Sequence, residues 1–347
     1  MQKKEGLGVI FAILGLPVVA LLVIAMLVTT NWSFPPIDES QTGYRGTSMM
    51  TLKDRGQEAD FRETVVVPEE PWELELPAEG EELAGDLYEN LQVLGHLGDD
   101  QFNRLMTAIT EWVSPEEGCV YCHNPENFAS DDIYTKIVAR RMIQMTQTIN
   151  ADWQDHVGDV GVTCYTCHRG QHVPENLWFT ADPEAYPFGR GQNKAEPASQ
   201  YASLPTDPFT PFLLNDAEIR LQAGQALPGS QAVYGTMQTE WTYSLMNHMA
   251  AGLGVNCTFC HNSRAWFNWE ESPPQRTTAW YGIRMARSIN QEFMHPLGPQ
   301  YPENRVGELG DGGKANCATC HAGVNKPLYG APMAQSYPSL LTPAPAE

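Results

Sequence analysis

The longest apolar run in the chain lies close to its N-terminus. Leu7–Val28 is a stretch of 22 residues without a charged side chain. As a helix rising about 1.5 Å per residue, such a stretch is roughly 33 Å long, enough to cross a hydrocarbon core of about 30 Å. Pro17 allows a kink in this helix and does not exclude it. The pattern therefore predicts a transmembrane anchor within residues 1–30.

The residues that flank this run predict its orientation. Lys3 and Lys4 precede it and mainly acidic sequence follows, so the positive-inside rule puts the N-terminus in the cytoplasm and the rest of the chain outside. A cleaved signal peptide is the main alternative, but its apolar stretch is shorter and ends in an Ala-x-Ala-like site. The length also argues against a buried core helix. Because the first cysteine is Cys119, a lipid-modified cysteine near the N-terminus is excluded.

The following segment, residues 31–100, is polar. Residues 57–90 are rich in Glu and Pro, a composition typical of extended backbone. We predict an extended acidic tether with few regular elements. Its aromatic side chains favour contacts with partner subunits over a purely solvated linker, and they are Trp32, Phe34, Tyr44 and Trp72.

From about residue 101 the pattern becomes helical, and it occurs twice. Residues 133–150 form one helical stretch and residues 277–293 another, each lying between two segments of similar sequence. Arg141-Met142 in the first stretch corresponds to Arg284-Met285 in the second. We therefore predict two similar modules. The link between them, about residues 171–233, is rich in Pro, Gly and Asn, which predicts loops and a short hairpin.

These patterns divide the chain into five parts. We predict an N-terminus with its anchor (1–30), the tether (31–100), a first module (101–200), a second module (201–335) and a Pro-rich tail (336–347). Aromatic residues make up 10% of the chain, which is inconsistent with a disordered protein. The formal net charge of −21 argues against nucleic-acid binding and suits either a basic partner or simple solubility.

The cysteines determine the chemistry. All eight fall into C-x-x-C pairs, and each pair is followed at once by a histidine. The four segments are Cys119-Val-Tyr-Cys122-His123, Cys164-Tyr-Thr-Cys167-His168, Cys257-Thr-Phe-Cys260-His261 and Cys317-Ala-Thr-Cys320-His321. In such a segment the thiols add to the two vinyl groups of haem and the histidine ligates the iron. Because no cysteine is left over, zinc and redox dithiols are poor alternatives, and we predict four covalently attached c-type haems.

Each iron also needs a sixth ligand from elsewhere in the chain. Met106 lies in a helical pattern 13 residues before Cys119, Met246 lies 11 residues before Cys257, and Met142 lies 22 residues before Cys164. A methionine on an apolar helix face is often only core packing, so the sequence leaves each assignment open. Met145 competes with Met142, and Met249 or His248 competes with Met246.

The fourth haem has three candidate sixth ligands. Internal symmetry favours Met285, the counterpart of Met142, although the insertion of residues 298–313 changes its distance to Cys317. His156 and His295 are the alternatives. The choice matters because His/Met ligation raises the reduction potential relative to His/His ligation.

Longer strings around these motifs resemble a known family, the tetrahaem cytochrome subunit of purple-bacterial photosynthetic reaction centres. The resemblance covers roughly residues 90–335 and includes Thr110-Glu-Trp-Val-Ser-Pro115, Tyr134-Thr-Lys-Ile-Val-Ala-Arg140 and Trp280-Tyr-Gly-Ile-Arg284-Met285. It implies a mainly α-helical multihaem cytochrome c with long irregular loops. It also implies Met106, Met142 and Met246 as sixth ligands of the first three haems and His156 as that of the fourth.

The resemblance implies a function as well. The subunit would accept electrons from a soluble periplasmic donor, such as a small c-type cytochrome or a high-potential iron-sulfur protein. It would re-reduce the photo-oxidised bacteriochlorophyll pair, and its haems would form a row with the Cys257 motif nearest the pair and the Cys119 motif farthest out. The chain would be an electron carrier on the periplasmic face of the inner membrane, bound to the L and M subunits of a core complex with the H subunit and antenna. Some family members carry a lipid-modified N-terminal cysteine, which this chain replaces with its predicted anchor.

Two further interpretations remain open from the residues alone. Arg141, Arg169, Arg264 and Arg284 lie near haem or ligand positions and either neutralise haem propionates or form ordinary surface ion pairs. The alternative function is a membrane-anchored multihaem quinol dehydrogenase or a respiratory redox subunit. Four His/His haems would need four distal histidines, whereas the remaining histidines are scattered and the methionines suit a high-potential carrier.

Overall fold

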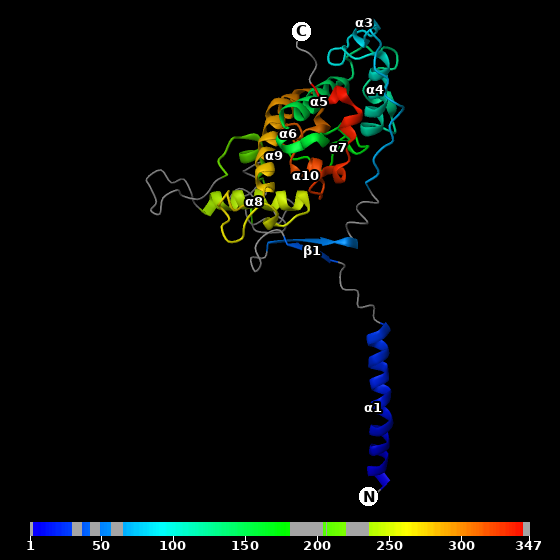
Figure 1. Ribbon diagram of the computed structural model, residues 1–347, viewed down its shortest axis with the longest axis vertical. Coiled ribbons are helices and arrows are strands. Elements are labelled where there is room, and N and C mark those ends of the chain that lie inside the picture. Colours follow the sequence, from blue (N-terminus) through cyan, green and yellow to red (C-terminus); the bar gives the residue numbers. More distant parts are fainter. Residues whose placement is uncertain are drawn as a thin grey trace, which may run out of the picture.

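The computed structural model describes residues 3–29, 37–41, 49–56, 65–180, 204–205, 207–219 and 236–342. Within these residues the chain is mainly helical with long loops, as predicted, and its β-structure is one two-stranded sheet. Figure 1 shows a body of packed helices, with helix α1 standing apart from it and the strands β1 and β2 at the end of the body that faces α1.

The regular elements are mostly short. The α-helices are α1 (Lys3–Thr29), α3 (Ala84–Leu87), α4 (Asp99–Val113), α5 (Tyr134–Asp152), α6 (Gln154–Val157), α7 (Cys164–His168), α8 (Thr236–Leu253), α9 (Gln275–Ile289) and α10 (Cys317–His321). The 3-10 and π turns are η1 (Gly118–Tyr121), η2 (Gly158–Val160), η5 (Thr210–Leu214), η6 (Cys257–Phe259), η7 (Asn290–Met294), η8 (His295–Gln300), η9 (Glu303–Arg305), η10 (Pro327–Gly330), η11 (Met333–Ser336) and η12 (Pro338–Leu340).

The longer helices agree with the sequence pattern. The expected stretches 133–150 and 277–293 correspond to α5 and to α9 followed by η7, and the periodic segments around Met106 and Met246 lie in α4 and α8. In the expected link, the described residues contain the π turn η5 and no strand of a hairpin. Residues 181–203, 206 and 220–233 of that link lie outside the described part of the chain.

Helix α1 covers the apolar run and includes Pro17. Its described side chains run from Pro17 onward, and the large apolar ones from Val18 to Val28 are exposed on all sides of the helix. Within the described part of the chain, no helix is both long and apolar enough to cross a membrane.

Strands β1 (Ile37–Gln41) and β2 (Met50–Asp54) form an antiparallel pair in which Ile37 lies opposite Asp54. The pair is attached to the body at the Cys257 motif. There the side chains of Asn256 and Thr258 donate hydrogen bonds of 2.7 and 3.3 Å to the backbone oxygen of Met50. Strand β2 therefore contacts the residues around the third motif directly.

Helix α4 shows how the sequence forms the body. Asp99 and Asp100 in its first turn stabilise the positive end of the helix dipole. Arg104, Leu105, Ala108 and Trp112 are buried and recur every three or four residues, so they form one face. The Arg104 guanidinium donates to the backbone oxygens of Trp72 and Ser336 and pairs with Glu70, which fastens residues 65–83 and the C-terminal region to α4.

The core consists of three clusters of buried residues. The first gathers Val93, Leu94, Leu97, Leu105, Ala108, Trp112, Ile143, Tyr337 and Leu340. The second gathers Trp178, Phe209, Phe212, Leu213, Leu245, Ile283 and Ala286, and the third gathers Ile149, Met285, Ile289, Phe293 and Ala315. Members of all three clusters, including Ile143, Ile283 and Ile289, line one central cavity.

Two helices that carry functional segments approach each other closely through glycine. Gly254, just beyond α8, has φ +63°, and a Cβ added to it would lie 2.0 Å from the backbone oxygen of Gly323. Gly323, just beyond α10, donates a 2.8 Å backbone hydrogen bond to Gly252. Only glycine permits this contact, which packs α10 against α8.

Candidate haem sites

Each C-x-x-C-H segment forms a single helical turn. The first and third are the 3-10 turns η1 and η6 with the residues next to them, and the second and fourth are the short helices α7 and α10. Asn316 caps α10 by accepting a hydrogen bond of 3.2 Å from the backbone nitrogen of Thr319, and Asn256 caps η6 in the same way through Thr258. One turn brings both thiols and the histidine of each segment to one side, as attachment to a porphyrin edge requires.

The four motif histidines share one hydrogen-bonding arrangement. In each, Nδ1 lies 2.9–3.1 Å from a backbone oxygen a few residues further along the chain. These pairs are His123 with Phe128, His168 with Gln171, His261 with Trp266, and His321 with Val324. Because a carbonyl oxygen can only accept, the proton sits on Nδ1 and the lone pair of Nε2 stays available for a metal.

His156 shares this arrangement, although it belongs to no motif. Its Nδ1 lies 2.9 Å from the backbone oxygen of Thr278 on α9. His172 differs, since its Nε2 lies 2.6 Å from a carboxylate oxygen of Glu117. His248 is buried with its Nε2 unpaired in the described part of the chain, and His295 is exposed at the start of η8. Of these four histidines, His156 is the one for which a contact of Nδ1 with a backbone oxygen matches that of the motif histidines, while His248 also has a free Nε2 in the described part of the chain.

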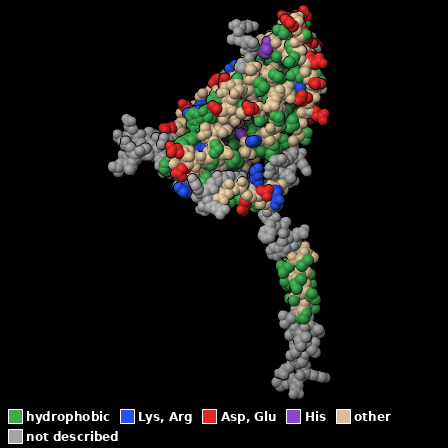
Figure 2. Space-filling view, viewed as in Figure 1, with side chains coloured by type: hydrophobic (Ala, Val, Ile, Leu, Met, Phe, Trp, Pro, Cys, Tyr) green, Lys and Arg blue, Asp and Glu red, His purple; other side chains and the backbone are tan. Residues whose placement is uncertain are grey.

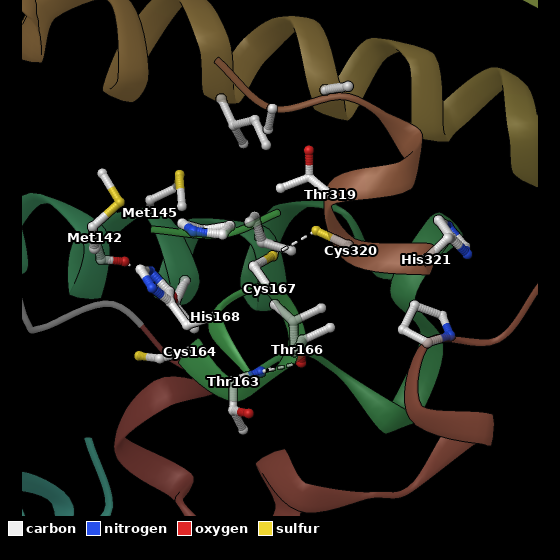
Figure 3. Close-up of a pocket in the computed structure, with 18 of the residues that line it drawn as sticks. Met142, Met145, Thr163, Cys164, Thr166, Cys167, His168, Thr319, Cys320 and His321 are labelled. Atoms are coloured by element: carbon white, nitrogen blue, oxygen red, sulfur yellow. Dashed lines mark hydrogen bonds between the residues drawn. The ribbon is translucent and has the colours of Figure 1, made fainter. Parts of the chain in front are cut away.

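A cavity of about 660 Å³ lies at the centre of the body. It is lined by the second and fourth motifs, with Cys164, Cys167, His168, Cys317, Cys320 and His321, and by the candidate ligands Met142 and His156. Met145, Met249 and Met285 also line it. Figure 3 shows Met142 and Met145 on the side of His168, and His321 on the opposite side beyond Cys320.

The two motifs in this cavity touch through their second cysteines. The sulfur atoms of Cys167 and Cys320 are 2.6 Å apart, and they face each other in Figure 3. The guanidinium of Arg169, directly after the second motif, donates a 3.1 Å hydrogen bond to the backbone oxygen of Cys320. The porphyrin edges attached at these two motifs would consequently be neighbours.

The rings of His156 and His321 lie in a geometry that fits one shared metal ion. Their centroids are 6.0 Å apart and their planes are inclined by 70°. A metal ion held by both imidazoles, with bonds of about 2 Å and about 1 Å more from each nitrogen to its ring centre, would need ring centres about 6 Å apart. The residues present therefore fit a haem iron held between these two imidazoles.

Two of the candidate methionines, Met106 and Met142, are each followed four residues later by a threonine that contacts the haem motif. This shared feature was not predicted from the sequence. The hydroxyl of Thr110 donates to the backbone oxygen of Met106 one turn earlier and lies 3.9 Å from the sulfur of Cys119. The hydroxyl of Thr146 donates to the backbone oxygen of Met142 in the same way and forms a hydrogen bond with Cys164. Each methionine therefore lies on the face of its helix that turns to its own motif. The repeated spacing Met-x-x-x-Thr was visible in the sequence.

The structure does not bring every candidate into the central cavity. Met106 packs beside the first core cluster, and Met246 packs beside the second on α8, the helix that contacts η6. Cys119 and Cys257 are exposed. The second and fourth motifs line the cavity with both cysteines and the histidine, whereas the first reaches it only through Tyr121 and Cys122 and the third only through Phe259.

Burial keeps several thiols and imidazoles of the cavity in their neutral forms. Burial raises the pKa of Cys164 and of Cys317 to about 12, so both thiols are protonated. Burial also lowers the pKa of His321 to about 4 and lowers the pKa of His156 and of His168. Neutral imidazoles are the form that ligates a metal.

The four arginines noted in the sequence have different surroundings. Arg141 donates to the backbone oxygen of Glu292, Arg264 lies 3.6 Å from Glu271, and Arg284 lies over the ring of Trp280. Arg169 differs from these, because its Nε is buried without a hydrogen-bond partner in the described part of the chain. An unpaired buried guanidinium nitrogen fits an anionic group such as a haem propionate.

Comparisons with known proteins agree with this chemistry. A family model described as the photosynthetic reaction centre cytochrome C subunit matches residues 33–341. The chain is 47% identical over 326 residues to the photosynthetic reaction center cytochrome c subunit of Thermochromatium tepidum, a match that covers 92% of this chain and 79% of that protein. It is 47% identical over 317 residues to the corresponding subunit of Rubrivivax gelatinosus, with 90% and 85% covered. It is 29% identical over 303 residues to cytochrome c-554 of Chloroflexus aurantiacus, with 69% of each covered. The chain therefore belongs to the family of photosynthetic reaction centre cytochrome c subunits.

Proposed function

We propose that this electron-transfer subunit of the reaction centre holds four covalent haems, takes electrons from a soluble periplasmic donor and re-reduces the photo-oxidised bacteriochlorophyll pair. The observation that carries the haem number is the shared arrangement of His123, His168, His261 and His321, each with Nδ1 on a backbone oxygen. When bound, the haems supply one-electron redox chemistry. The chain supplies attachment, orientation and a mainly apolar surrounding.

The ligand set that we propose is His/Met for three haems and His/His for the fourth. The contacts of Thr110 and Thr146 with Cys119 and Cys164 support Met106 and Met142. Met246 is supported by the packing of α8 against η6. His156 is supported over Met285 and His295 by its Nδ1 bond to Thr278 and its 6.0 Å separation from His321.

We propose further that the haems form a row with the third motif nearest the membrane and the first motif farthest out. The attachment of Met50 to the third motif places that motif at the end of the body facing α1 (Figure 1). The second and fourth motifs share the central cavity, and the first packs on α4 at the opposite end. This order is compatible with the two predicted modules, since each contributes one motif that lines the cavity with both cysteines and the histidine.

A basic soluble donor is the proposed partner at the outer end. Figure 2 shows Asp and Glu side chains concentrated over the end of the body that carries α3 and α4. Exposed carboxylates near the first motif include Glu116, Glu126 and Asp132. Such a surface attracts a basic protein electrostatically and speeds its encounter with the subunit.

As a reaction-centre subunit the chain is associated with the membrane. We propose that Leu7–Val28 anchors it there in a single pass, with the haem-bearing body in the periplasm against the L and M subunits. The absence of charge over 22 residues supports this anchor, and so does the exposure of apolar side chains on all sides of α1.

A redox titration of the purified complex under flash illumination tests the function. We expect one haem to be oxidised after each flash at potentials where the haems begin reduced. If no haem is oxidised after a flash, the photosynthetic role is wrong, although the four attached haems would stand.

The His156→Met variant tests the ligand set. A thioether in place of an imidazole should raise the reduction potential of one haem and leave the other three near their original values. His295→Met serves as the matched control and should change none, because His295 is exposed. Four unchanged potentials in His156→Met would contradict the proposed ligand.

A further inference from the structure

The imidazole of His156 lies directly against the backbone of α9 at Gly282. A Cβ added to Gly282 would lie 2.5 Å from Cε1, 2.8 Å from Nδ1 and 3.1 Å from Nε2 of His156. Contacts under 3.0 Å are essentially never made by real Cβ atoms. The ring occupies the space that any other residue at position 282 would fill.

The same helix also holds the ring by a hydrogen bond. Nδ1 of His156 lies 2.9 Å from the backbone oxygen of Thr278, one turn before Gly282 on α9. The short helix α6, which carries His156, packs against α9. The ring therefore lies against the α9 backbone, its Nε2 has no hydrogen-bond partner among the described residues, and its centre is 6.0 Å from that of His321.

The companion helix α5 differs from α9 at the corresponding position. When Arg141-Met142 is aligned with Arg284-Met285, Gly282 corresponds to Ala139. Both residues line the central cavity, as do Met142 and Met285. At this position α5 has the methyl group of Ala139 and α9 has none. The missing methyl group is on α9, the helix whose methionine, Met285, is replaced as a ligand by His156 in the proposed set.

We infer that Gly282 is a positioning residue that admits His156 as sixth ligand of the fourth haem, and that its missing side chain is the reason why this haem takes His156 rather than Met285. The inference rests on the ligand set proposed above. The physical cause is steric, because a methyl group at position 282 occupies the place of the ring and lies 3.1 Å from the ligating nitrogen. Met285 is the thioether that would otherwise be expected as the ligand, because it is the counterpart of Met142 on α9. Its side chain is 8% exposed and lines the cavity.

The Gly282→Ala variant of the whole reaction-centre complex tests this inference. Alanine favours a helix more than glycine does, so α9 itself should not be weakened. We expect one haem of the four to lose the magnetic signature of two imidazole ligands in electron paramagnetic resonance and near-infrared magnetic circular dichroism. The reduction potential of that haem should rise, because an imidazole ligand is lost or replaced by a thioether.

Two further variants separate a specific effect from a general one. Ala139→Gly makes the reverse change at the matching position of α5 and should leave all four ligand signatures unchanged. Gly282→Ala placed in a His156→Ala background should add no further change in haem content or thermal stability, because the group that clashes is gone. This double variant also provides the test if Gly282→Ala alone fails to assemble. A defect larger than that of His156→Ala alone would overturn the inference.

The comparison with His156→Met distinguishes the possible failures. If His156→Met alters one haem while Gly282→Ala leaves all four signatures and potentials as in the natural chain, the inference is wrong and the ligand set stands. If neither variant alters any haem, His156 is not a ligand, and the inference fails together with the proposed ligand set.

Discussion

Single residues set the orientation of the candidate ligands through backbone carbonyl oxygens. Five histidines, among them His156 and His321, place Nδ1 on a carbonyl, and two threonines anchor their hydroxyls on the carbonyls of Met106 and Met142. A carbonyl oxygen does not change its protonation state in the physiological range, unlike a carboxylate partner. The ligand tautomer should therefore be insensitive to pH.

For single residues, the sequence was informative where the residues of a site are close together in the chain. The eight cysteines and their four histidines could be identified because each motif is local. The threonines Thr110 and Thr146 were accessible in principle through their fixed spacing from a methionine. Gly282 was not, because its role is a contact with His156, which lies far away in the sequence and reaches it only in the folded chain.

Asp131 provides a pH-dependent prediction for a single residue. A hydrogen bond from Arg140 lowers the pKa of Asp131 from 3.8 to about 2, with help from Asn90 and Lys136. The ionised Asp131 carboxylate stabilises the folded chain at pH values above the pKa of the unfolded state, which is 3.8. This stabilisation is lost as the pH falls through the folded-state pKa of about 2. Asp131→Asn should therefore reduce the free energy of unfolding at pH 7 by at most about 1 kcal/mol, because the pair is exposed and screened.

Thermal unfolding measured from pH 7 downward checks this prediction. The difference in stability between the natural chain and Asp131→Asn should have its full size above about pH 4 and should become smaller as the pH approaches 2. Added salt should also narrow it. Asp132→Asn, which removes a neighbouring charge, is the control, and an equal effect in both variants would show that Arg140 is not the cause.

At the scale of elements, periodicity predicted the long helices and failed for the short ones. Helices α4, α5, α8 and α9 have apolar positions at helical spacing. The turns η1 and η6 and the helices α7 and α10 are too short for periodicity to reveal, and they are fixed by their caps and by the motif they carry. Residues 65–83 are joined to α4 by a hydrogen bond from Trp72 to Asp100 and by the bonds of Arg104, a charged residue that the sequence alone would place on the surface.

The insertion of helix α1 into a membrane can be tested directly. Val19→Arg with Ile24→Arg should prevent its insertion, because each arginine near the centre of a membrane helix costs about 2.5–3.5 kcal/mol. In cells that lack the partner subunits, alkaline extraction of the membranes should then release the chain. The matched variant Val19→Leu with Ile24→Leu should stay in the membrane. Retention of the double-arginine chain under these conditions would contradict the anchor.

At the scale of the whole molecule, the body is polarised. The end beside α1 carries the third motif and the strands, while the opposite end carries the first motif and a concentration of acidic side chains (Figure 2). The sequence predicted the net charge of −21 but not where on the surface it gathers, because that depends on how distant segments pack. It also left open that the second and fourth motifs share one cavity.

This polarity predicts where a charge change will matter. Glu126→Lys, near the first motif, should slow the second-order reduction by a basic donor by roughly two- to tenfold at low salt. Glu218→Lys makes the same change in net charge away from that motif and should have little effect. The difference should disappear at high ionic strength, where the charges are screened. Equal slowing by both variants in stopped-flow measurements would show that donors do not dock at this end.

The contact between Cys167 and Cys320 also has a consequence for how the chain matures. These residues are 153 positions apart, and the cavity they share is lined by residues from Ile109 to Ala331. Contacts of such long range form late in folding, after most of the chain is present. The cavity wall can thus close only after the fourth motif has been made. We therefore expect the proposed haems of the second and fourth motifs to be attached before the centre of the body closes.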